Sequence, residues 1–289
     1  MKVLLFGGGG MLASDLARTA PAGATIRAVS RAECDVTEHT AVARLAQEAR
    51  PELIVNASAY TAVDEAERER ETAFAVNGTA VGAMARVAAD LGVPLIHYST
   101  DYVFGGDVRR PYREDDPTSP INAYGASKLL GEQLVAGSGA QALVIRTQWL
   151  FGFAGKSFVR TMWNRARDRQ PTRVVDDQWG RPTYTLDLAR VTWRLAGAGR
   201  TGLLHVTNGG TAVTWFSLAA RVFAAVGARD LLTACRTADY PTAAVRPTYS
   251  ALDTARVASL LGEEPPDWTS AVDRFLAELE AGSAVSAAR

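Results

Sequence analysis

Short apolar runs alternate with segments of helical spacing over the first 150 residues, and this alternation restricts the fold more than any other feature of the chain. The runs that indicate strands are 3–6, 26–29, 53–57, 93–98 and 142–146, and the segments that indicate helices are 11–20, 41–49, a stretch that ends near 91, and 123–137. Strands separated by helices of this length form parallel βαβ units with right-handed crossovers. We therefore predict an α/β fold, in which helices cover both faces of one doubly wound parallel sheet and ligands gather at the carboxyl ends of its strands.

The pattern changes after residue 150. Loops rich in Gly, Pro and Asp, with the sequences VVDDQWGRPTY, TNGGTAVTW and YPTAAVRPTYS, separate shorter elements there, and such loops commonly carry binding residues. We expect residues 1–150 to form a nucleotide-binding domain of the Rossmann type. Residues 151–280 would then form a smaller, mainly substrate-binding C-terminal lobe, with some segments returning to the first domain. The segment 281–289 has little to bury and is expected to be a disordered tail.

Charge and composition exclude several classes of protein. The formal net charge is +0 and the basic residues form no stripe, which excludes nucleic acid as a partner. Two cysteines, Cys34 and Cys235, are too few for a disulfide framework and indicate a reducing cytosol. No apolar run reaches the roughly 18 residues of a spanning helix, so we expect a cytoplasmic protein without a membrane. The three histidines lack metal-ligand spacing, and no metal site is predicted.

The run FGGGGMLASDL lies between the first strand and the first helix. It fits a dinucleotide fingerprint as Gly8-x-Gly10-x-x-Ala13 or as Gly7-x-x-Gly10-x-x-Ala13. Glycines permit a tight turn and a close backbone approach to a diphosphate, and the helix N-terminus offers free N–H groups to its charge. A flexible loop is the alternative, but the position between a strand and a helix favours a nucleotide.

The end of the second strand bears on which dinucleotide is bound. Ser30 and Arg31 offer a hydroxyl and a guanidinium, which suit a ribose 2′-phosphate and favour NADPH. Glu33 lies close enough to leave NADH as the alternative. Asp35 and Val36 can frame the adenine, although an aspartate at a turn is as often a local cap.

The sequence YGASK places Tyr124 and Lys128 four positions apart, so that both side chains lie on one face of a helix. An ammonium beside a phenol should lower the pKa of the phenol and make it a usable general acid near neutral pH. Thr100 ends the fourth strand and can offer a hydroxyl to the same carbonyl oxygen. A solvated helix face is the alternative for the pair alone, but the glycine run and the strand-end hydroxyl favour a catalytic site.

Eight stretches in chain order carry a resemblance to a known family. They are LLFGGGGML, PELIVNASAYTAVDEAE, FAVNGTA, HYSTDYVFGG, PYREDDPTSPINAYGASKLLGE, VIRTQWLFG, VVDDQWGRPT and AVRPTYSALDT, and they span residues 1 to about 255. By these motifs the chain resembles the extended short-chain dehydrogenase/reductases. Within them it is similar to the dTDP-4-dehydrorhamnose reductase branch, which acts on dTDP-4-keto-6-deoxysugars.

The resemblance assigns roles to residues of this chain. It implies the following set, in which Thr100, Tyr124 and Lys128 are catalytic, Gly7, Gly10, Met11 and Leu12 contact the diphosphate, Asp35 and Val36 the adenine, and Ala57, Ala59, Tyr60 and Asn77 the cofactor ribose, with Tyr124 and Lys128 also touching the cofactor. It implies substrate contacts at Thr61, Val63, Asp101, Tyr102, Trp149, Gln178, Arg181, Thr183 and Arg246, the last of these at the diphosphate of the sugar nucleotide. It also allows a homodimer and Mg²⁺ at a dimer contact, although we predict no metal.

Some positions depart from the family pattern. Ala13 replaces the third glycine and is small enough for close helix packing. Ser58, Ser157 and Tyr249 replace other expected residues in or near the substrate lobe. These departures bear on which sugar is bound more than on the reaction.

The favoured function is NAD(P)H-dependent reduction of the C4 ketone of a dTDP-4-keto-6-deoxyhexose, most simply dTDP-4-dehydro-L-rhamnose to dTDP-L-rhamnose. The alternatives are a 4-ketoreductase for another dTDP-deoxysugar, an epimerase or dehydratase of the same superfamily, and a non-catalytic NADP-binding regulatory subunit. The intact Thr100, Tyr124 and Lys128 favour an enzyme. Trp149 follows the fifth strand and is the tryptophan most expected at the sugar, whereas the charged run that begins at Asp64 indicates a solvated helix face.

Overall fold

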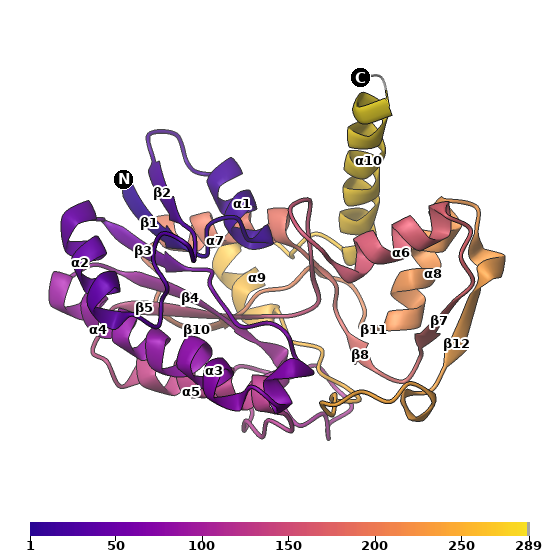
Figure 1. Cartoon of the computed structure of the whole chain (residues 1–289), viewed down its shortest axis with the longest axis horizontal. Coiled ribbons are helices and arrows are strands. Elements are labelled where there is room, and N and C mark those ends of the chain that lie inside the picture. The colour runs from indigo at the N-terminus through magenta and orange to yellow at the C-terminus, as the bar shows by residue number, and fades with distance from the viewer. Residues whose placement is uncertain (288–289) are drawn as a thin grey trace.

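The computed structural model describes residues 1–287 of the chain, with side chains described as far as residue 281. Six parallel strands form the central sheet in the order β10-β5-β4-β3-β1-β2 (Figure 1). Their bounds are β1 Lys2–Phe6, β2 Thr25–Val29, β3 Leu53–Asn56, β4 Leu95–Thr100, β5 Ala142–Thr147 and β10 Gly202–His205. The prediction of a doubly wound α/β fold is therefore confirmed.

Helices cover both faces of this sheet. One face carries α1 (Met11–Arg18), α7 (Thr185–Gly197) and α9 (Ala255–Leu261), and the other carries α2 (His39–Ala49), α4 (Ala80–Leu91) and α5 (Ala123–Ala136). Side chains alternate along each strand, so Val3 and Leu5 pack toward the first group of helices while Leu4 and Phe6 pack toward the second. Burial on both faces explains why the central strands β1 and β3 are almost continuously apolar, whereas the edge strand β2 is largely exposed.

The crossover between β3 and β4 contains several short elements before its main helix. It contains the 3₁₀ turn η1 (Glu65–Glu67), α3 (Arg70–Phe74) and the π-helical turn η2 (Ala75–Thr79) before α4 begins. A second 3₁₀ turn, η3 (Asp101–Val103), follows β4 directly. These irregular elements lie at the carboxyl ends of the strands, where the site is built.

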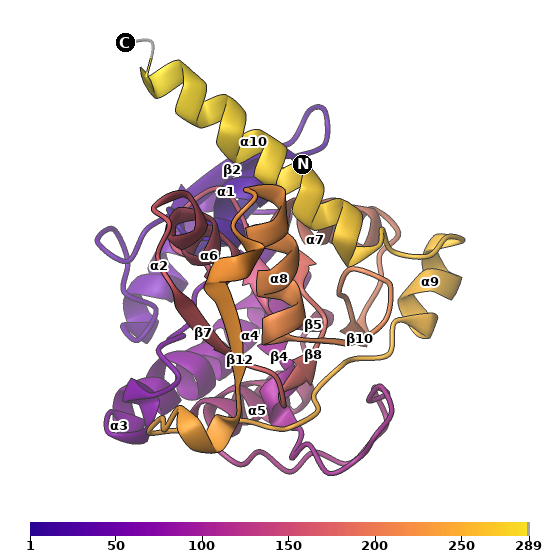
Figure 2. The same ribbon diagram turned by 90° about the vertical axis from the view of Figure 1, so that its right-hand side faces the viewer.

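A smaller lobe has its own core. Its larger elements are α6 (Phe158–Arg167), β7 (Thr172–Val175), α8 (Trp215–Ala225), β12 (Leu232–Cys235) and α10 (Trp268–Ala287), with the short strands β6 (Leu150–Phe151), β8 (Trp179–Gly180), β9 (Thr183–Tyr184) and β11 (Val213–Thr214) and the turns η4 (Arg229–Leu231) and η5 (Thr237–Asp239). Figure 2 looks onto this lobe, where α6, α8 and α10 gather with β7 and β12. Phe151, Trp163 and Phe223 are buried at its centre. Between its segments α7 and β10 return to the first domain.

The C-terminal helix α10 runs to Ala287 and so enters the segment 281–289 that the sequence predicted to be disordered. Alanine has the highest helix propensity, and this alanine-rich stretch continues a helix whose earlier turns are packed into the lobe. Residues 288–289 of the predicted tail lie outside the described residues.

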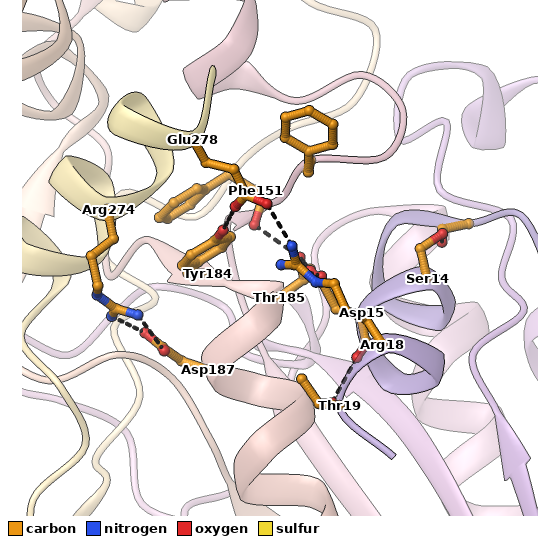
Figure 3. Close-up of polar contacts among 12 residues, drawn as sticks. Ser14, Asp15, Arg18, Thr19, Phe151, Tyr184, Thr185, Asp187, Arg274 and Glu278 are labelled. Atoms are coloured by element: carbon orange, nitrogen blue, oxygen red, sulfur yellow. Dashed lines mark hydrogen bonds and ion pairs between the residues drawn. The ribbon is translucent and has the colours of Figure 1, made fainter. Parts of the chain in front are cut away.

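Polar contacts join helix α1 to residues of β9, α7 and α10 (Figure 3). Thr185 Oγ1 donates to Asp15 Oδ2 at 2.5 Å, and Arg18 pairs with Asp15 at 2.9 Å and with Glu278 of α10 at 2.5 Å. The hydroxyl of Tyr184 also donates to Glu278. Because Asp15 is buried, these contacts fix the orientation of α1 against the second lobe.

Within residues 1–287, no helix combines the length and the apolar character that crossing a bilayer requires. In the same part of the chain, no three His, Cys, Asp or Glu side chains gather closely enough to hold a metal ion. Cys34 and Cys235 are buried free thiols.

Candidate active site

The glycine run forms a tight loop between β1 and α1. Gly7 N and Gly8 N both donate to the carbonyl of Val29, at 3.1 and 2.8 Å, and Gly7 has a φ of 90°. A Cβ on Gly7 would lie 2.6 Å from the carbonyl carbon of Ala57, so a side chain there would collide with backbone. Gly10 precedes α1 and has no side chain to cap it, which leaves the first N–H groups of the helix available to an anion.

A cavity of about 250 Å³ opens beside this loop. Among the residues predicted to bind the cofactor, those that line it are Gly7, Gly10, Arg31, Asp35, Val36, Ala57, Ala59 and Tyr60. Met11 lies instead against Gly152 of the second lobe, and the side chain of Leu12 is buried in the core. The glycine loop that leaves room for a close approach of its backbone, the free helix N-terminus and the adjoining cavity together fit the adenosine and diphosphate portion of a dinucleotide.

The residues after β2 hold one another in place. Ser30 N and Oγ each donate to Glu33 Oε2 at 2.9 Å, and Arg31 Nε donates to Asp35 Oδ2 at 3.1 Å. Asp35 also accepts from N and Oγ1 of Thr37, so it caps the local turn as well as lining the cavity. The side chain of Arg31 is 83% exposed and can turn toward a ligand at little cost.

Asn77 supports the cavity from behind. Its side chain accepts from Tyr60 N and donates to the Tyr60 carbonyl, both at 2.9 Å, and it also donates to Ser127 of α5 at 3.0 Å. The residue is buried in the π-helical turn η2. Asn77 therefore fixes the backbone of Tyr60 against α5 rather than lining the cavity.

The helix that carries Tyr124 and Lys128 starts at a defined point. Asn122 caps α5 by accepting from Gly125 N at 2.8 Å. A Cβ on Gly125 would lie 2.1 Å from the carbonyl oxygen of Tyr102, so glycine is required for the first turn of α5 to approach η3. This contact brings the helix against the end of β4, where Thr100 lies.

The three predicted catalytic residues are held by buried contacts. Lys128 Nζ donates to the carbonyl of Tyr98 at 2.6 Å, and Thr100 Oγ1 donates to Asp101 Oδ1 at 3.1 Å. Thr100 and Lys128 are both buried, and Tyr124 is partly buried. The hydroxyl of Thr100 is within hydrogen-bonding reach of the Tyr124 phenol.

The pKa of Tyr124 does not move in the predicted direction. Burial raises the pKa of Tyr124 to about 12, against the opposing effect of the hydrogen bond from Thr100. Burial also lowers the pKa of Lys128 to about 8, with Glu132 acting in the opposite sense. The prediction of a lowered phenol pKa was wrong for this structure, because the phenol loses solvation and lies near the carboxyl group of Asp101, and both raise its pKa.

Tyr124 packs near residues that line two different cavities. With Tyr60, which lines the first cavity, it packs against a small cluster of alanines. On its other side the ring of Tyr102 meets it edge-on, with centroids 6.0 Å apart, and Tyr102 lines a second cavity of about 430 Å³. Tyr124 itself is not among the residues that line either cavity, and Tyr60 and Tyr102 connect it to them.

The second cavity collects some of the predicted substrate residues. Tyr102, Gln178 and Arg246 line it together with Asp64. The guanidinium of Arg246 holds Asp64 through two bonds, Nη1 to Oδ1 at 2.7 Å and Nη2 to Oδ2 at 2.6 Å. Asp64 is therefore an ion-pair partner, and this pairing lowers its pKa to about 2. Within the charged run 64–71, for which the sequence indicated a solvated helix face, most residues are exposed, and Asp64 is the one held by a distant cation.

The other predicted substrate residues are not among those that line this cavity. The ring of Trp149 stacks on Trp215, with centroids 3.6 Å apart, and its backbone has an unusual φ of 49°. The guanidinium of Arg181 donates to Thr254 at 3.3 Å, and Thr183 is buried in β9. Thr61 is exposed, Val63 is partly buried, and Asp101 is buried beside Thr100.

Comparison with known proteins identifies the relatives of this chain. A family model described as the RmlD substrate binding domain matches residues 1–281. The chain belongs to this family. It is 39% identical over 296 residues to dTDP-4-dehydrorhamnose reductase of Burkholderia thailandensis, covering 96% of this chain and 99% of that protein.

Two further relatives bear on the site of this RmlD-family chain. The crystal structure of dTDP-4-dehydrorhamnose reductase from Bacillus anthracis in complex with NADP matches it with a TM-score of 0.92 and 34% identity, over 96% of this chain and 99% of that one. A dTDP-4-keto-6-deoxy-D-glucose reductase of Streptomyces niveus is 41% identical over 227 residues, which is 78% of each protein.

Sequence reasoning missed several residues of the second cavity. Cationic and aromatic side chains line it in addition to those predicted, namely Phe158, Arg165, Arg173, Trp215 and Tyr240. They come from α6, β7, α8 and the loop after η5, and no short motif connects them. The sequence signal for them was the high density of arginine and aromatic residues in the predicted substrate lobe of this RmlD-family chain. That density does not show which of these residues come together in the fold.

Arg31 provides a test of the cofactor site. We expect Arg31→Ala to weaken NADPH binding about tenfold while changing NADH binding less than about twofold, because a charge-assisted bond to a 2′-phosphate is worth about 1.5 kcal/mol or more. Fluorescence titration of each nucleotide measures both constants. Arg27→Ala removes an exposed arginine from the same strand region and serves as the control. Equal loss of both nucleotides in Arg31→Ala would contradict a role at the 2′-phosphate.

Proposed function

We propose that the chain is an NADPH-dependent reductase of the C4 ketone of a dTDP-4-keto-6-deoxyhexose. The substrate is dTDP-4-dehydro-L-rhamnose and the product is dTDP-L-rhamnose. The relatives from Burkholderia thailandensis and Bacillus anthracis support this proposal, since both carry the corresponding name and the second was crystallised with NADP.

The position of Tyr124 is the observation that carries the proposal. A proton donor for ketone reduction must reach a substrate oxygen while the cofactor reaches the neighbouring carbon. Tyr124 packs against the same alanine cluster as Tyr60, which lines the cavity at the glycine loop, and its ring meets that of Tyr102, which lines the arginine-lined cavity. The second cavity suits a sugar nucleotide, because guanidinium groups bind diphosphate and aromatic rings pack on a base or sugar.

Each residue of the proposed active site has a separate role in the reduction. When bound, the nicotinamide supplies the hydride that reduces the carbonyl carbon. Tyr124 gives its phenolic proton to the carbonyl oxygen, so that the ketone becomes an alcohol and Tyr124 is left as a phenolate. Lys128 is cationic below a pKa of about 8; it would hold the nicotinamide ribose and stabilise that phenolate. Thr100 would hydrogen-bond the same oxygen.

The decisive test is loss of NADPH absorbance with freshly made dTDP-4-keto-6-deoxyglucose, with and without a 3,5-epimerase. Oxidation that depends on the epimerase is the expected result and identifies a rhamnose-type reductase. Repeating the assay with NADH measures the cofactor preference. No oxidation in either arm, despite tight NADPH binding, would reject the proposal.

A second candidate is a 4-ketoreductase of a different dTDP-deoxysugar. The similarity to the dTDP-4-keto-6-deoxy-D-glucose reductase of Streptomyces niveus favours it, as do the departures Ser157 and Tyr249 near the substrate lobe. The same assay separates the two candidates, since this one predicts oxidation without the epimerase. Analysis of the product sugar by NMR then gives the configuration at C4.

We also propose a setting for this activity. Residues 1–150 would bind the cofactor and most of 151–280 the sugar nucleotide, in a cytoplasmic enzyme supplied with NADPH. A homodimer is proposed on the family resemblance, and light scattering should then give about twice the chain mass of 30.8 kDa.

A further inference from the structure

Asp101 is a buried carboxyl group placed next to the catalytic hydroxyl. Its Oδ1 accepts from Thr100 Oγ1 at 3.1 Å, and its Oδ2 accepts from Ser250 Oγ at 2.5 Å. Ser250 reaches it from the far end of the chain and is itself buried. Both carboxyl oxygens therefore have hydroxyl partners, and the one that faces Thr100 is Oδ1.

Thr100 has more acceptors than it has protons. Its oxygen already accepts from Tyr102 N at 3.2 Å, and its single proton can go either to Asp101 or toward the phenol of Tyr124. A hydroxyl has one proton to donate and two lone pairs. A carboxylate is the stronger competitor because charge-assisted hydrogen bonds are about twice as strong as neutral ones. While Asp101 is ionised, the Thr100 proton is thus withheld from the reacting oxygen.

We propose that the protonation state of Asp101 sets the direction in which the Thr100 hydroxyl donates. In the protonated form, Oδ1–H donates to Thr100 Oγ1, and the Thr100 proton is free to donate to the substrate oxygen that Tyr124 protonates. In the ionised form, Asp101 takes the Thr100 proton. Ser250 holds Oδ2 as an acceptor and so leaves Oδ1 to carry the proton. This inference rests on the proposed reductase function, in which Asp101 is a positioning residue that acts through Thr100.

The surroundings allow this switch to work near neutral pH. Burial raises the pKa of Asp101 to about 7, although its hydrogen bonds act against the shift. The titratable groups that face it are Tyr102 on its own turn and Tyr124 on α5, and the ion pair of Arg246 with Asp64 lies beyond, against Tyr102. The pKa values of Tyr102, Tyr124 and Arg246 are raised, and that of Asp64 is lowered to about 2. All four groups therefore keep their charge state while Asp101 titrates.

The pH profile of kcat tests the proposal. Asp101 is protonated below its pKa of about 7, so its contribution to kcat should fall about tenfold between pH 6 and pH 8. Deprotonation of Lys128, whose pKa is about 8, adds a further decrease of kcat at the alkaline end of the profile. In Asp101→Asn the amide can donate to Thr100 at every pH, and we expect the fall due to Asp101 to disappear while that of Lys128 remains.

Matched variants separate positioning from a structural role. Asp90→Asn removes an exposed carboxylate and should leave the wild-type profile. In a Thr100→Ala background, Asp101→Asn should not change the shape of the profile further, because its target hydroxyl is gone. A lowered kcat of Asp101→Asn with the wild-type pH dependence would overturn the proposal.

Infrared spectroscopy tests Asp101 independently of turnover. In protein labelled with ¹³C-aspartate, the band of the protonated Asp101 carboxyl group is assigned by its absence from the spectrum of Asp101→Asn. The intensity of this band should titrate near neutral pH. Thr100→Ala removes a donor to the carboxylate and should shift that midpoint upward; an unchanged midpoint would overturn the coupling. If the protein reduces the keto-sugar but neither the pH profile nor the midpoint of the carboxyl band changes in the variants, this inference is wrong and the proposed function stands. No turnover at any pH defeats the proposed function, and the band still decides whether Asp101 and Thr100 are coupled.

Discussion

Tyr124→Phe should lower kcat by about three orders of magnitude while changing the dissociation constant of NADPH less than about threefold. The variant removes the phenolic proton of the proposed general acid, and loss of a general acid costs between about 10² and 10⁴ in rate. The cofactor keeps the glycine loop, the helix N-terminus and Lys128, which explains the small change in binding. Stopped-flow single turnover and fluorescence titration measure the two quantities.

The neighbouring Tyr102 gives the control for this prediction. Its ring packs edge-on against Tyr124 and it lines the second cavity, where its hydroxyl contacts Arg246. Tyr102→Phe should therefore raise KM for the sugar nucleotide with little effect on the chemical step. Near-normal single-turnover rates in Tyr124→Phe, or an equally large loss of rate in Tyr102→Phe, would contradict the role assigned to Tyr124.

The parts of the site that the sequence predicted are those with local rules. A strand, a glycine turn and a helix follow one another within residues 1–20, and the spacing of Tyr124 and Lys128 fixes a shared helix face. Parallel strands end at one edge of the sheet, which brings Thr100 to the same place. These arrangements follow from geometry over a few residues or from the sheet topology.

The parts that the sequence could not predict depend on distant partners. Arg246 and Asp64 are 182 residues apart, and the charged run around Asp64 looks solvated because its partner is not visible in the local sequence. Ser250 reaches Asp101 over 149 residues. The pKa of Tyr124 was misjudged for the same reason, since spacing gives the neighbouring ammonium but not the burial.

Arg146→Met should lower the free energy of unfolding by about 3–5 kcal/mol. Arg146 of β5 holds Glu132 of α5 through Nε to Oε1 at 2.9 Å and Nη2 to Oε2 at 2.7 Å, and the two side chains are 4% and 9% exposed. The arginine also lies over the ring of Phe104, 5.0 Å from its centroid. Its removal leaves a buried carboxylate without a cation, and urea denaturation measures the loss.

The double variant Arg146→Met with Glu132→Leu should recover most of that stability, because replacing both members of a buried ion pair by apolar residues is often close to neutral. Its pH profile should nevertheless differ from that of the wild type. Glu132 opposes the lowering of the Lys128 pKa by burial, so without it the pKa falls further below about 8 and the alkaline loss of kcat begins at a lower pH. A double variant as unstable as Arg146→Met would show that packing matters more than charge, and an unmoved alkaline limb would show that Glu132 does not help to keep Lys128 cationic.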